Sequence, residues 1–392
     1  MTDAEIRKAL SRLWEEDMTF SSGKILGSMC SKPDPLAAQV FADALEKNIG
    51  DTGLFPGTKR LEEEAVSEIA SFLSSTEAKG SIVTGGTEAN FLALLAAKNH
   101  AGKNKREVVL PESAHYSFDK AAAFMDLSLR KIPLTDSFTA DVNSLREAVN
   151  DRTMAIIAVA GSTGLGAVDP IPEIAKIAQR HSVYLHVDAA FGGFVLPFLK
   201  GAGYKGYPFD FSIEGVSSIT IDPHKMGRAP VPAGCILFRD EQTARLAETP
   251  VSYLAGGRIL QRTLVGTRSG ASVAAVWAAV KRLGVEGYTE IVKRCMDTTL
   301  WFSDRLKRIP GIELVMEPVM NVVGIRSTTF SQGEFASAIR SRGWAVSLFP
   351  DFIRIVLMPH LTREVLDSFL TDLTEIVKHA IVNEESSSRE NR

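Results

Sequence analysis

The sequence predicts an α/β protein with a large, mostly parallel seven-stranded sheet and a smaller C-terminal α+β domain. Between residues 81 and 239, short apolar runs typical of buried strands alternate with segments that have helical periodicity. Parallel strands need crossover connections, so the alternation predicts helices on both faces of the sheet. In such sheets ligands bind at the carboxyl ends of the strands, and several glycines and polar residues of this chain fall there.

Each element is assigned from periodicity and from the turn residues that bound it. An amphipathic helix is expected over residues 4–16, a second over 35–48, and a third opening at the Glu62-Glu63-Glu64 run. The strands of the large sheet are expected at residues 81–84, 108–111, 127–133, 153–160, 183–187, 217–222 and 235–239. The intervening helices are expected at residues 88–98, 115–124, 141–150 and 170–180.

The C-terminal part follows a helix over residues 271–283. It is expected to contain helices at 285–309, 332–342 and 362–382, with strands at 312–316, 322–327, 344–348 and 352–357. The predicted organisation is an N-terminal helical and loop segment (1–55), a large α/β domain (56–284) and a small α+β domain (285–382). The polar tail, 383–392, is expected to be disordered.

Composition argues against several classes of function. The 392 residues are 45% hydrophobic, and a net charge of −3 implies no nucleic-acid partner. Three cysteines (Cys30, Cys235 and Cys295) are too few and too scattered for a disulfide framework or a C-x-x-C metal site. The N-terminus has no signal-peptide h-region, and no apolar stretch is long enough to span a membrane. We therefore expect a cytoplasmic protein without a metal or a membrane partner.

The tetrapeptide Asp222-Pro223-His224-Lys225 ends a strand-like run, so Lys225 leaves the strand at its carboxyl end. A lysine after a turn is ordinarily a solvated surface residue. The alternative is a Schiff-base lysine, whose amine is a nucleophile only when it is deprotonated. Potential positive charge on His224 and Arg228 favours the deprotonated amine. Spacing alone does not decide between the two.

The stretch His186-Val187-Asp188-Ala189-Ala190 ends another strand-like run about 35 residues upstream. Asp188 could be an ordinary turn or capping residue. Its functional interpretation is a carboxylate that pairs with the ring nitrogen of pyridoxal phosphate and keeps it protonated, so that the ring serves as an electron sink. The pair of strand-end Asp and strand-end Lys favours this interpretation.

A glycine turn, Gly85-Gly86-Thr87, feeds the start of a helix, where free backbone N–H groups can bind a phosphate. Alone this signal is weak, but the suspected cofactor has a phosphate. A second glycine-rich loop, Gly161 to Gly166, is not a dinucleotide-binding motif, because its glycines are spaced G-x-x-G-x-G. A tight loop that presents Thr163 to a cofactor fits better.

These motifs resemble the fold-type I pyridoxal-phosphate enzymes, and HVDAA with DPHK resembles their group II amino-acid decarboxylases. The resemblance covers roughly residues 50–379. It is strongest to the archaeal L-tyrosine/L-aspartate decarboxylases, on the stretches ILGSMCSKPDP, GDTGLFPGTKRLEEE, GGTEAN, HVDAAFGGF, DPHKMGRAPVPAGCILFR and IVLMPHLT. It implies pyridoxal 5'-phosphate as cofactor. It also implies conversion of L-tyrosine to tyramine, for methanofuran biosynthesis, or of L-aspartate to β-alanine, for coenzyme A biosynthesis.

The resemblance also implies roles for individual residues. Lys225 is expected to form the Schiff base and Asp188 to pair with the ring nitrogen. His115, otherwise an ordinary helix-start histidine, would stack on one ring face, and Ala190 would pack on the other. Thr163 would lie near the ring or the substrate carboxylate. The residues expected around the phosphate are Gly86, Thr87, Asp222, His224 and, from a second subunit of a homodimer, Gly266 and Thr267.

Three further residues are expected to act on the amino-acid substrate. Arg354 resembles the arginine that holds the α-carboxylate, although an isolated strand arginine usually faces solvent. Ser28 would line the substrate pocket, although a turn serine is an equal alternative. Tyr253, in the segment 248–262, is the candidate that returns a proton to Cα, from a mobile loop that reaches across the dimer.

Alternative functions are an aminotransferase, a pyridoxal-phosphate lyase that cleaves another bond, and a non-catalytic pyridoxal-binding regulatory protein. The intact set of Lys225, Asp188 and His115 argues against the last. The sequence does not identify the residues that recognise the substrate side chain; Lys24, Lys32 and Arg60 are cationic candidates for aspartate, or are simply solvated.

Overall fold

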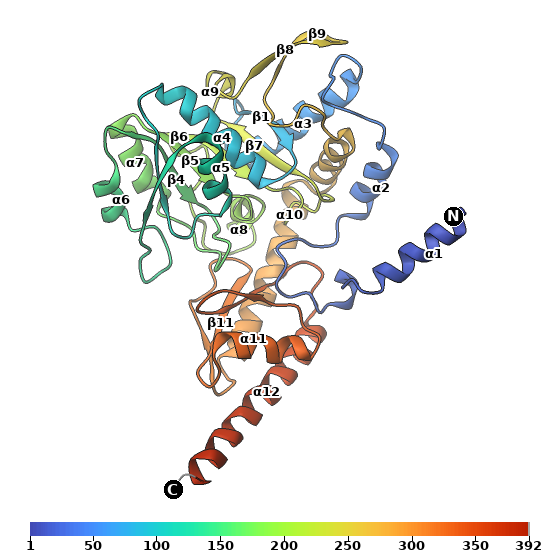
Figure 1. Ribbon diagram of the computed structural model, residues 1–392, viewed down its shortest axis with the longest axis vertical. Coiled ribbons are helices and arrows are strands. Elements are labelled where there is room, and N and C mark those ends of the chain that lie inside the picture. The colour runs from blue at the N-terminus through green and yellow to red at the C-terminus, as the bar shows by residue number, and fades with distance from the viewer. Residues whose placement is uncertain (391–392) are drawn as a thin grey trace. The chain divides into compact units, whose positions relative to one another are not determined.

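The computed structural model describes residues 1–390, with side chains described through residue 379. It divides into two compact units, each of which is described by itself. The larger unit comprises residues 33–296 and 318–320, and the smaller comprises residues 1–32, 297–317 and the chain from 321 onward. Figure 1 labels the helices and strands.

The larger unit is built on a seven-stranded sheet with the order β1-β7-β6-β5-β4-β2-β3. β7 is antiparallel to both of its neighbours, and the other neighbouring strands run parallel. The connection from β6 to β7 contains no helix, so β7 returns antiparallel beside β6. The strands are β1 (Lys79–Val83), β2 (Glu107–Pro111), β3 (Ser128–Ile132), β4 (Thr153–Val159), β5 (Tyr184–Asp188), β6 (Val216–Ile221) and β7 (Gly234–Phe238). The predicted fold class is confirmed.

Helices cover this sheet because their apolar faces need burial. α4 contacts five of the strands and lies beside α5 (Figure 1). α4 is buried along most of its length, as expected for a helix that packs against a sheet of Val and Ile side chains. The helices are α2 (Pro35–Asp43), α3 (Pro56–Phe72), α4 (Gly86–Ala101), α5 (Ser117–Met125), α6 (Val142–Ala148), α7 (Ile171–His181), α8 (Leu196–Leu199) and α9 (Glu241–Arg245), with η2 (Gly192–Phe194) as a 3₁₀ turn.

The open edge of β1 is covered by an ion pair. The N–H of Ile82 donates to Glu62 Oε1 at 2.9 Å, and the carbonyl of Ile82 accepts from Arg268 Nη1 at 2.9 Å. Arg268 and Glu62 also form a two-armed salt bridge, with the second arm, Nη2 to Oε2, at 3.2 Å. These two side chains take the place of a neighbouring strand, which protects the edge from pairing with another chain.

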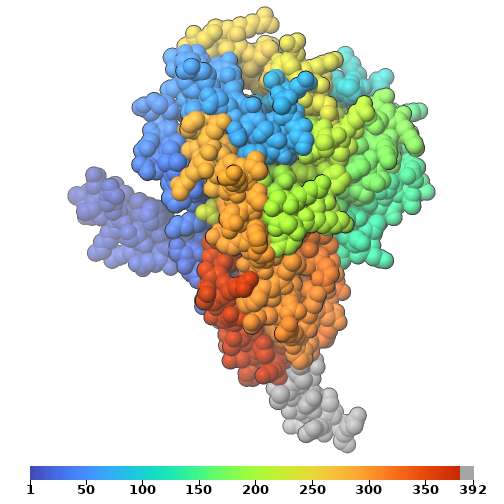
Figure 2. All heavy atoms as spheres, turned by 180° about the vertical axis from the view of Figure 1, so that it is seen from behind, coloured from blue at the N-terminus to red at the C-terminus, as the bar shows by residue number. Residues whose placement is uncertain are grey.

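α10 (Gly270–Leu306) is one continuous element interrupted at Gly284, whose φ of 54° is not helical. The two helices predicted over 271–283 and 285–309 match its two halves. In the larger unit its first half lies beside α3, the two adjacent orange and blue segments in Figure 2. Trp277 Nε1 donates to Glu64 Oε2 at 2.8 Å, and Lys281 Nζ contacts Glu68 Oε2 at 2.7 Å.

The segment predicted as a loop over 248–262 is a two-stranded hairpin of β8 (Thr249–Leu254) and β9 (Gly257–Gln261). Ala255-Gly256 form its turn, and Gly256 packs so closely on Gly53 that a β-carbon on Gly53 would lie 2.1 Å from its nitrogen. These strands are not predictable from the sequence, because most of their side chains are exposed and the run therefore lacks a buried face.

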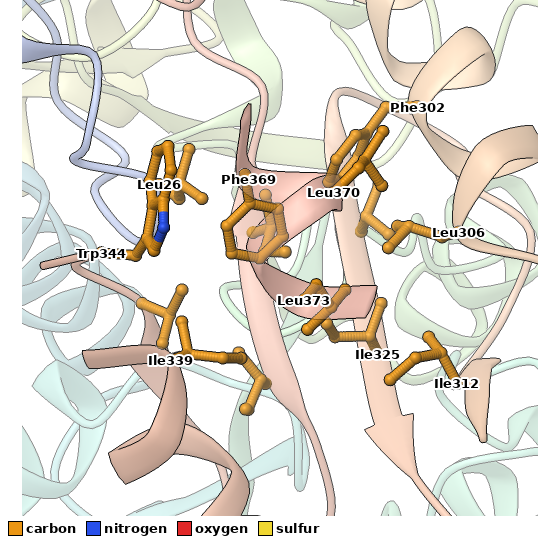
Figure 3. Close-up of a cluster of buried hydrophobic side chains, with 14 of the residues drawn as sticks. Leu26, Phe302, Leu306, Ile312, Ile325, Ile339, Trp344, Phe369, Leu370 and Leu373 are labelled. Atoms are coloured by element: carbon orange, nitrogen blue, oxygen red, sulfur yellow. The ribbon is translucent and has the colours of Figure 1, made fainter. Parts of the chain in front are cut away.

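The smaller unit is a four-stranded antiparallel sheet with the order β10-β11-β13-β12. The strands are β10 (Ile312–Leu314), β11 (Val322–Ser327), β12 (Ser347–Leu348) and β13 (Ile353–Val356), and the helices are α1 (Asp3–Trp14), α11 (Gln332–Ser341) and α12 (Arg363–Glu390), with η1 (Phe20–Ser22) as a 3₁₀ turn. Figure 3 shows its core, in which Phe369 packs edge-on against Trp344 beside Leu373 and Ile325.

The units differ from the contiguous domains expected from sequence. Residues 1–32 belong to the smaller unit, because Ile25 forms a parallel bridge with Ala345 and Leu26 is fully buried in the core of Figure 3. α12 extends through residues 383–390, where composition predicted disorder, and residues 391–392 of that tail lie outside the described residues. In the part of the chain that the structure describes, none of the helices is long and apolar enough to cross a membrane.

Candidate active site

Lys225 follows the carboxyl end of β6 and faces a buried carboxylate. Its Nζ lies 3.0 Å from Asp222 Oδ2, and the side chains of Lys225 and Asp222 are 20% and 3% exposed. His224 Nε2 lies 3.8 Å from the same oxygen. His224 Nδ1 lies 2.5 Å from the carbonyl oxygen of Ala233, which can only accept, so Nδ1 carries a proton. The contact between Lys225 Nζ and Asp222 Oδ2 orients the lysine amine at the strand end.

The turn Gly85-Gly86 joins β1 to α4 beside these residues. Among the described residues no side chain caps α4, so its first N–H groups remain available at the positive end of the helix dipole. A β-carbon on Gly86 would lie 2.9 Å from Asp222 Oδ2 and 3.3 Å from Ala190 Cβ. Glycine at this position leaves space next to the helix terminus, and Thr87 is exposed on the first turn. The geometry suits a bound phosphate.

Asp188 is the last residue of β5, the strand next to β6. The residue is 6% exposed, and both carboxylate oxygens are hydrogen-bonded. Oδ1 accepts from the N–H of Ala190 at 3.0 Å, and Oδ2 accepts from Asn90 Nδ2 at 2.9 Å. These donors fix the carboxylate in one orientation, as is needed for a group that pairs with a ring nitrogen.

His115 lies in the connection between β2 and α5, half-buried at the same edge of the sheet. Its Nδ1 accepts from the N–H of Ser117 at 3.3 Å. Burial lowers the pKa of His115, the nearby charge of Asp188 raises it, and that of Lys225 lowers it again. His115 thus lies within electrostatic reach of both Asp188 and Lys225. A neutral imidazole here is suited to packing on an aromatic ring.

The remaining residues predicted in the larger unit are arranged as follows. Ala190 is half-buried, and its carbonyl accepts from the N–H of Asp222 at 3.1 Å. Thr163 is half-buried in the loop that follows β4. Gly266 and Thr267 are exposed and pack against the backbone at Gly50.

Tyr253 is 86% exposed on β8. Its side chain is thus directed away from the packed interior of its own unit.

Arg354 and Ser28 belong to the smaller unit. Arg354 is 8% exposed on β13, not solvent-facing, and its Nη2 donates to the carbonyl of Gly27 at 2.6 Å and to Ser347 Oγ at 3.0 Å. Burial lowers the pKa of Arg354 to about 10. Within its own loop, Ser28 Oγ accepts from the N–H of Cys30 at 3.0 Å and lies 3.2 Å from the carbonyl oxygen of Cys30.

Two buried residues of α4, Glu88 and Asn90, were not singled out from the sequence. Both lie in the stretch GGTEAN on either side of the buried Ala89, and Asn90 is followed by the buried Phe91. A buried polar side chain needs a hydrogen-bond partner, so an amide and a carboxylate directly before the apolar run that begins at Phe91 were the available signal. Most of the partners could not be predicted, because they come from segments far away in the chain; Thr84, a partner of Glu88, is the local exception.

The residues of the larger unit fit pyridoxal phosphate. Asp222 Oδ1 is buried without a partner among the described residues, beside the space that Gly86 leaves open. An uncapped helix terminus suits the phosphate, a lysine amine suits the aldehyde, and an oriented carboxylate suits the ring nitrogen. Fold and site therefore define a pyridoxal-phosphate enzyme of fold type I.

Comparison with known protein families supports the same class of enzyme. Residues 14–328 match the pyridoxal-dependent decarboxylase conserved domain, and the chain belongs to this family. It is a pyridoxal-phosphate-dependent amino-acid decarboxylase, as the sequence motifs predicted.

Curated relatives are similar over nearly their whole length. The chain is 48% identical over 377 residues to the L-aspartate decarboxylase of Thermococcus kodakarensis, covering 96% of this chain and 98% of that protein. It is 47% identical to the probable L-tyrosine/L-aspartate decarboxylase of Methanothermobacter thermautotrophicus, and the match covers 92% of this chain and 99% of that protein.

Solved structures support the fold. The sphingosine-1-phosphate lyase of Burkholderia pseudomallei is similar with a TM-score of 0.90 at 28% identity, covering 100% of this chain and 94% of that one. The glutamate decarboxylase of Lactobacillus brevis is similar with a TM-score of 0.86 at 24% sequence identity, and the match covers 96% of this chain and 93% of that one.

Proposed function

We propose that this enzyme converts L-aspartate to β-alanine, with L-tyrosine, which yields tyramine, as a second candidate substrate. The observation that carries this proposal is that eight relatives at 42–48% identity all have L-aspartate in their names, whereas only three also name L-tyrosine. The Cα–carboxylate bond breaks, CO₂ leaves, and one proton is added at Cα.

The residues of the larger unit have distinct tasks in this reaction. When bound, pyridoxal phosphate supplies the electron sink that receives the electron pair of the broken bond. Lys225 binds the aldehyde carbon through Nζ, which Asp222 holds in place. Asp188 holds the proton on the ring nitrogen. His115 and Ala190 pack on the two ring faces, Thr163 lies beside the ring or the substrate carboxylate, and the first turn of α4 with His224 binds the phosphate.

Arg354 and Ser28 are proposed to bind the substrate. A buried guanidinium suits a carboxylate, because its fork matches the two oxygens. Support comes from the two hydrogen bonds of Arg354 Nη2 to Gly27 and Ser347, which orient the fork from the loop that also carries Ser28. Arg354→Lys should then raise the KM for aspartate, since the charge stays but the fork is lost.

We also propose a homodimer with shared active sites. The exposure of Tyr253 and of the Gly266-Thr267 turn supports this, since neither is packed into the interior of its own chain. Tyr253 would return the proton to Cα of the substrate bound by the neighbouring subunit, and Gly266 and Thr267 would complete that subunit's phosphate site. A cytoplasmic location is proposed from composition, and β-alanine and tyramine would serve coenzyme A and methanofuran biosynthesis.

The test is a substrate panel with purified protein loaded with pyridoxal phosphate. Aspartate, tyrosine, glutamate and cysteine are supplied separately, and CO₂ and the amine are measured. We expect β-alanine as the main product. Lys225→Ala is the control: it should lose turnover together with the visible absorbance of the bound cofactor. Turnover of tyrosine but not aspartate would refute the proposed substrate, and release of an aldehyde instead of CO₂ would indicate the lyase alternative.

A further inference from the structure

A connected group of buried polar side chains lies behind Asp188. We call it the Asn90 network; it consists of Asn90, His186, Ser218 and Thr220, from α4, β5 and β6. Asn90 is 1% exposed and the other three residues are 0% exposed. Burying polar groups costs free energy unless they are hydrogen-bonded, so four of them together need a defined arrangement of donors and acceptors.

The contacts determine the orientation of the Asn90 amide. Its Nδ2 lies 2.9 Å from Asp188 Oδ2 and 2.9 Å from Ser117 Oγ. Its Oδ1 accepts from Thr220 Oγ1 at 2.8 Å. The reversed amide would set its oxygen against the carboxylate, and two acceptors repel each other. Asn90 therefore presents a donor to Asp188.

His186 holds this amide from the other side. His186 Nε2 lies 3.1 Å from Asn90 Oδ1, which can only accept, so Nε2 carries the proton. Nδ1 then accepts from Ser218 Oγ at 2.8 Å. Complete burial lowers the pKa of His186 to about 4, so the ring is neutral near pH 7. The network thus supplies Asp188 with a hydrogen bond from an amide and with no cationic charge.

We propose that Asn90 is a positioning residue that keeps Asp188 ionised and directed at the ring nitrogen of the cofactor. The proposal rests on the proposed role of Asp188. A hydrogen bond donated to a carboxylate favours its charged form. Without that bond the carboxylate becomes more basic, and the proton shared with the ring nitrogen moves toward Asp188. The ring then loses charge and becomes a weaker electron sink.

The test reads the ring nitrogen directly. The enzyme is loaded with pyridoxal phosphate carrying ¹⁵N in the ring, and the ¹⁵N chemical shift is followed from pH 6 to pH 9 without substrate. In Asn90→Ala we expect the shift to move toward that of unprotonated pyridine. Decarboxylation should fall about ten- to hundredfold, the range for one hydrogen bond to a charged group. Should Asn90→Ala not fold, Asn90→Ser carries the same test, since its hydroxyl ends one bond short of the amide nitrogen.

Asn150→Ala is the matched control. Its Nδ2 also donates to a carboxylate, Glu107 Oε1, but at the amino ends of β2 and β4. It should leave the ¹⁵N shift as in the wild type. A wild-type shift in folded Asn90→Ala or Asn90→Ser would overturn the role of Asn90 alone. An unprotonated ring nitrogen in the wild type would overturn the role of Asp188, and this proposal with it, whatever the substrate.

Discussion

At the scale of single residues, two carboxylates at neighbouring strand ends have different partners. Asp222 faces the amine of Lys225 and the imidazole of His224, whereas Asp188 accepts hydrogen bonds from the Asn90 amide and the Ala190 backbone. These different partners suit the two carboxylates to different tasks. In the proposed mechanism, Asp222 orients the amine that binds the cofactor, and Asp188 is available to a positively charged ring nitrogen.

Asp188→Asn should separate cofactor binding from catalysis. The phosphate site and Lys225 are unchanged, so the cofactor should still bind with its visible absorbance. An amide cannot hold the ring nitrogen protonated, so kcat should fall by orders of magnitude. The measurement is kcat alongside the absorbance spectrum. A loss smaller than about tenfold, on the order of 1.4 kcal/mol, would make Asp188 merely structural.

His186 makes stability depend on pH. Its pKa in the folded protein is about 4, below the ordinary 6.5, because burial disfavours the charged ring. Between these values the unfolded chain binds a proton that the folded chain does not. Unfolding free energy should therefore decrease as pH falls from 6.5 toward 4, by up to about 1.4 kcal/mol per pH unit.

The difference between wild type and His186→Gln isolates this effect in urea unfolding of the cofactor-free protein. Burial raises the pKa of Asp169 to about 6, so the stability it contributes at low pH is lost as pH rises through that value, the opposite slope. Both proteins share Asp169, and it cancels in the difference. Equal pH slopes for the two proteins would mean that His186 does not titrate as described.

At the scale of elements, the motif positions were predictable because each marks a change from strand to turn. Lys225 and Gly86 follow predicted strands, and Asp188 ends another. The hairpin of β8 and β9 was not predictable, since its exposed strands carry no period-two apolar pattern. The contact of Glu88 with Leu264 was equally hidden, because it joins residues 176 positions apart.

Glu88 links the segment that follows the β8–β9 hairpin to Thr84, the residue before the Gly85-Gly86 turn. Its Oε2 accepts from the N–H and hydroxyl of Thr84 at 2.8 and 2.7 Å, and its Oε1 accepts from the N–H of Leu264 at 3.0 Å. Both oxygens act as acceptors. Glutamine would place a donor against a donor on one side, so Glu88→Gln should loosen the segment 249–265.

Hydrogen exchange measured by mass spectrometry checks this prediction. Peptides covering residues 249–265 should exchange several-fold faster in Glu88→Gln, while peptides from β4 and β5 stay as in the wild type. Glu64→Gln is the control, because Glu64 accepts from Trp277 on the surface and does not contact the hairpin. Unchanged exchange at the hairpin would show that Glu88 does not hold it.

At the scale of the whole molecule, the sequence predicted the large sheet but not which segments of the chain belong to each of the two units. Residues 1–32 join the smaller unit through Leu26 and Ile25, a pairing across more than 300 positions that local pattern cannot reveal. Tyr253, by contrast, is not packed within its own unit. At 86% exposure on β8, its side chain is available to a surface outside its own chain.

Shared active sites would provide that surface, and mixing two inactive variants tests them. Lys225→Ala and Tyr253→Phe should each lack activity alone. If Tyr253 acts on the neighbouring subunit, a hybrid dimer contains one complete site, with Lys225 from one chain and Tyr253 from the other. Statistical mixing makes half of the dimers hybrids, so activity should recover to about a quarter of wild type.

Subunit exchange must be verified in the same mixture, for which native mass spectrometry of one tagged and one untagged variant suffices. A mixture of Lys225→Ala with the double variant Lys225→Ala/Tyr253→Phe is the matched control, because no hybrid of these chains has a complete site. Recovery in the first mixture and none in the second places Tyr253 in trans. If hybrids form and activity stays absent in both, Tyr253 acts within its own chain, and the shared-site proposal fails.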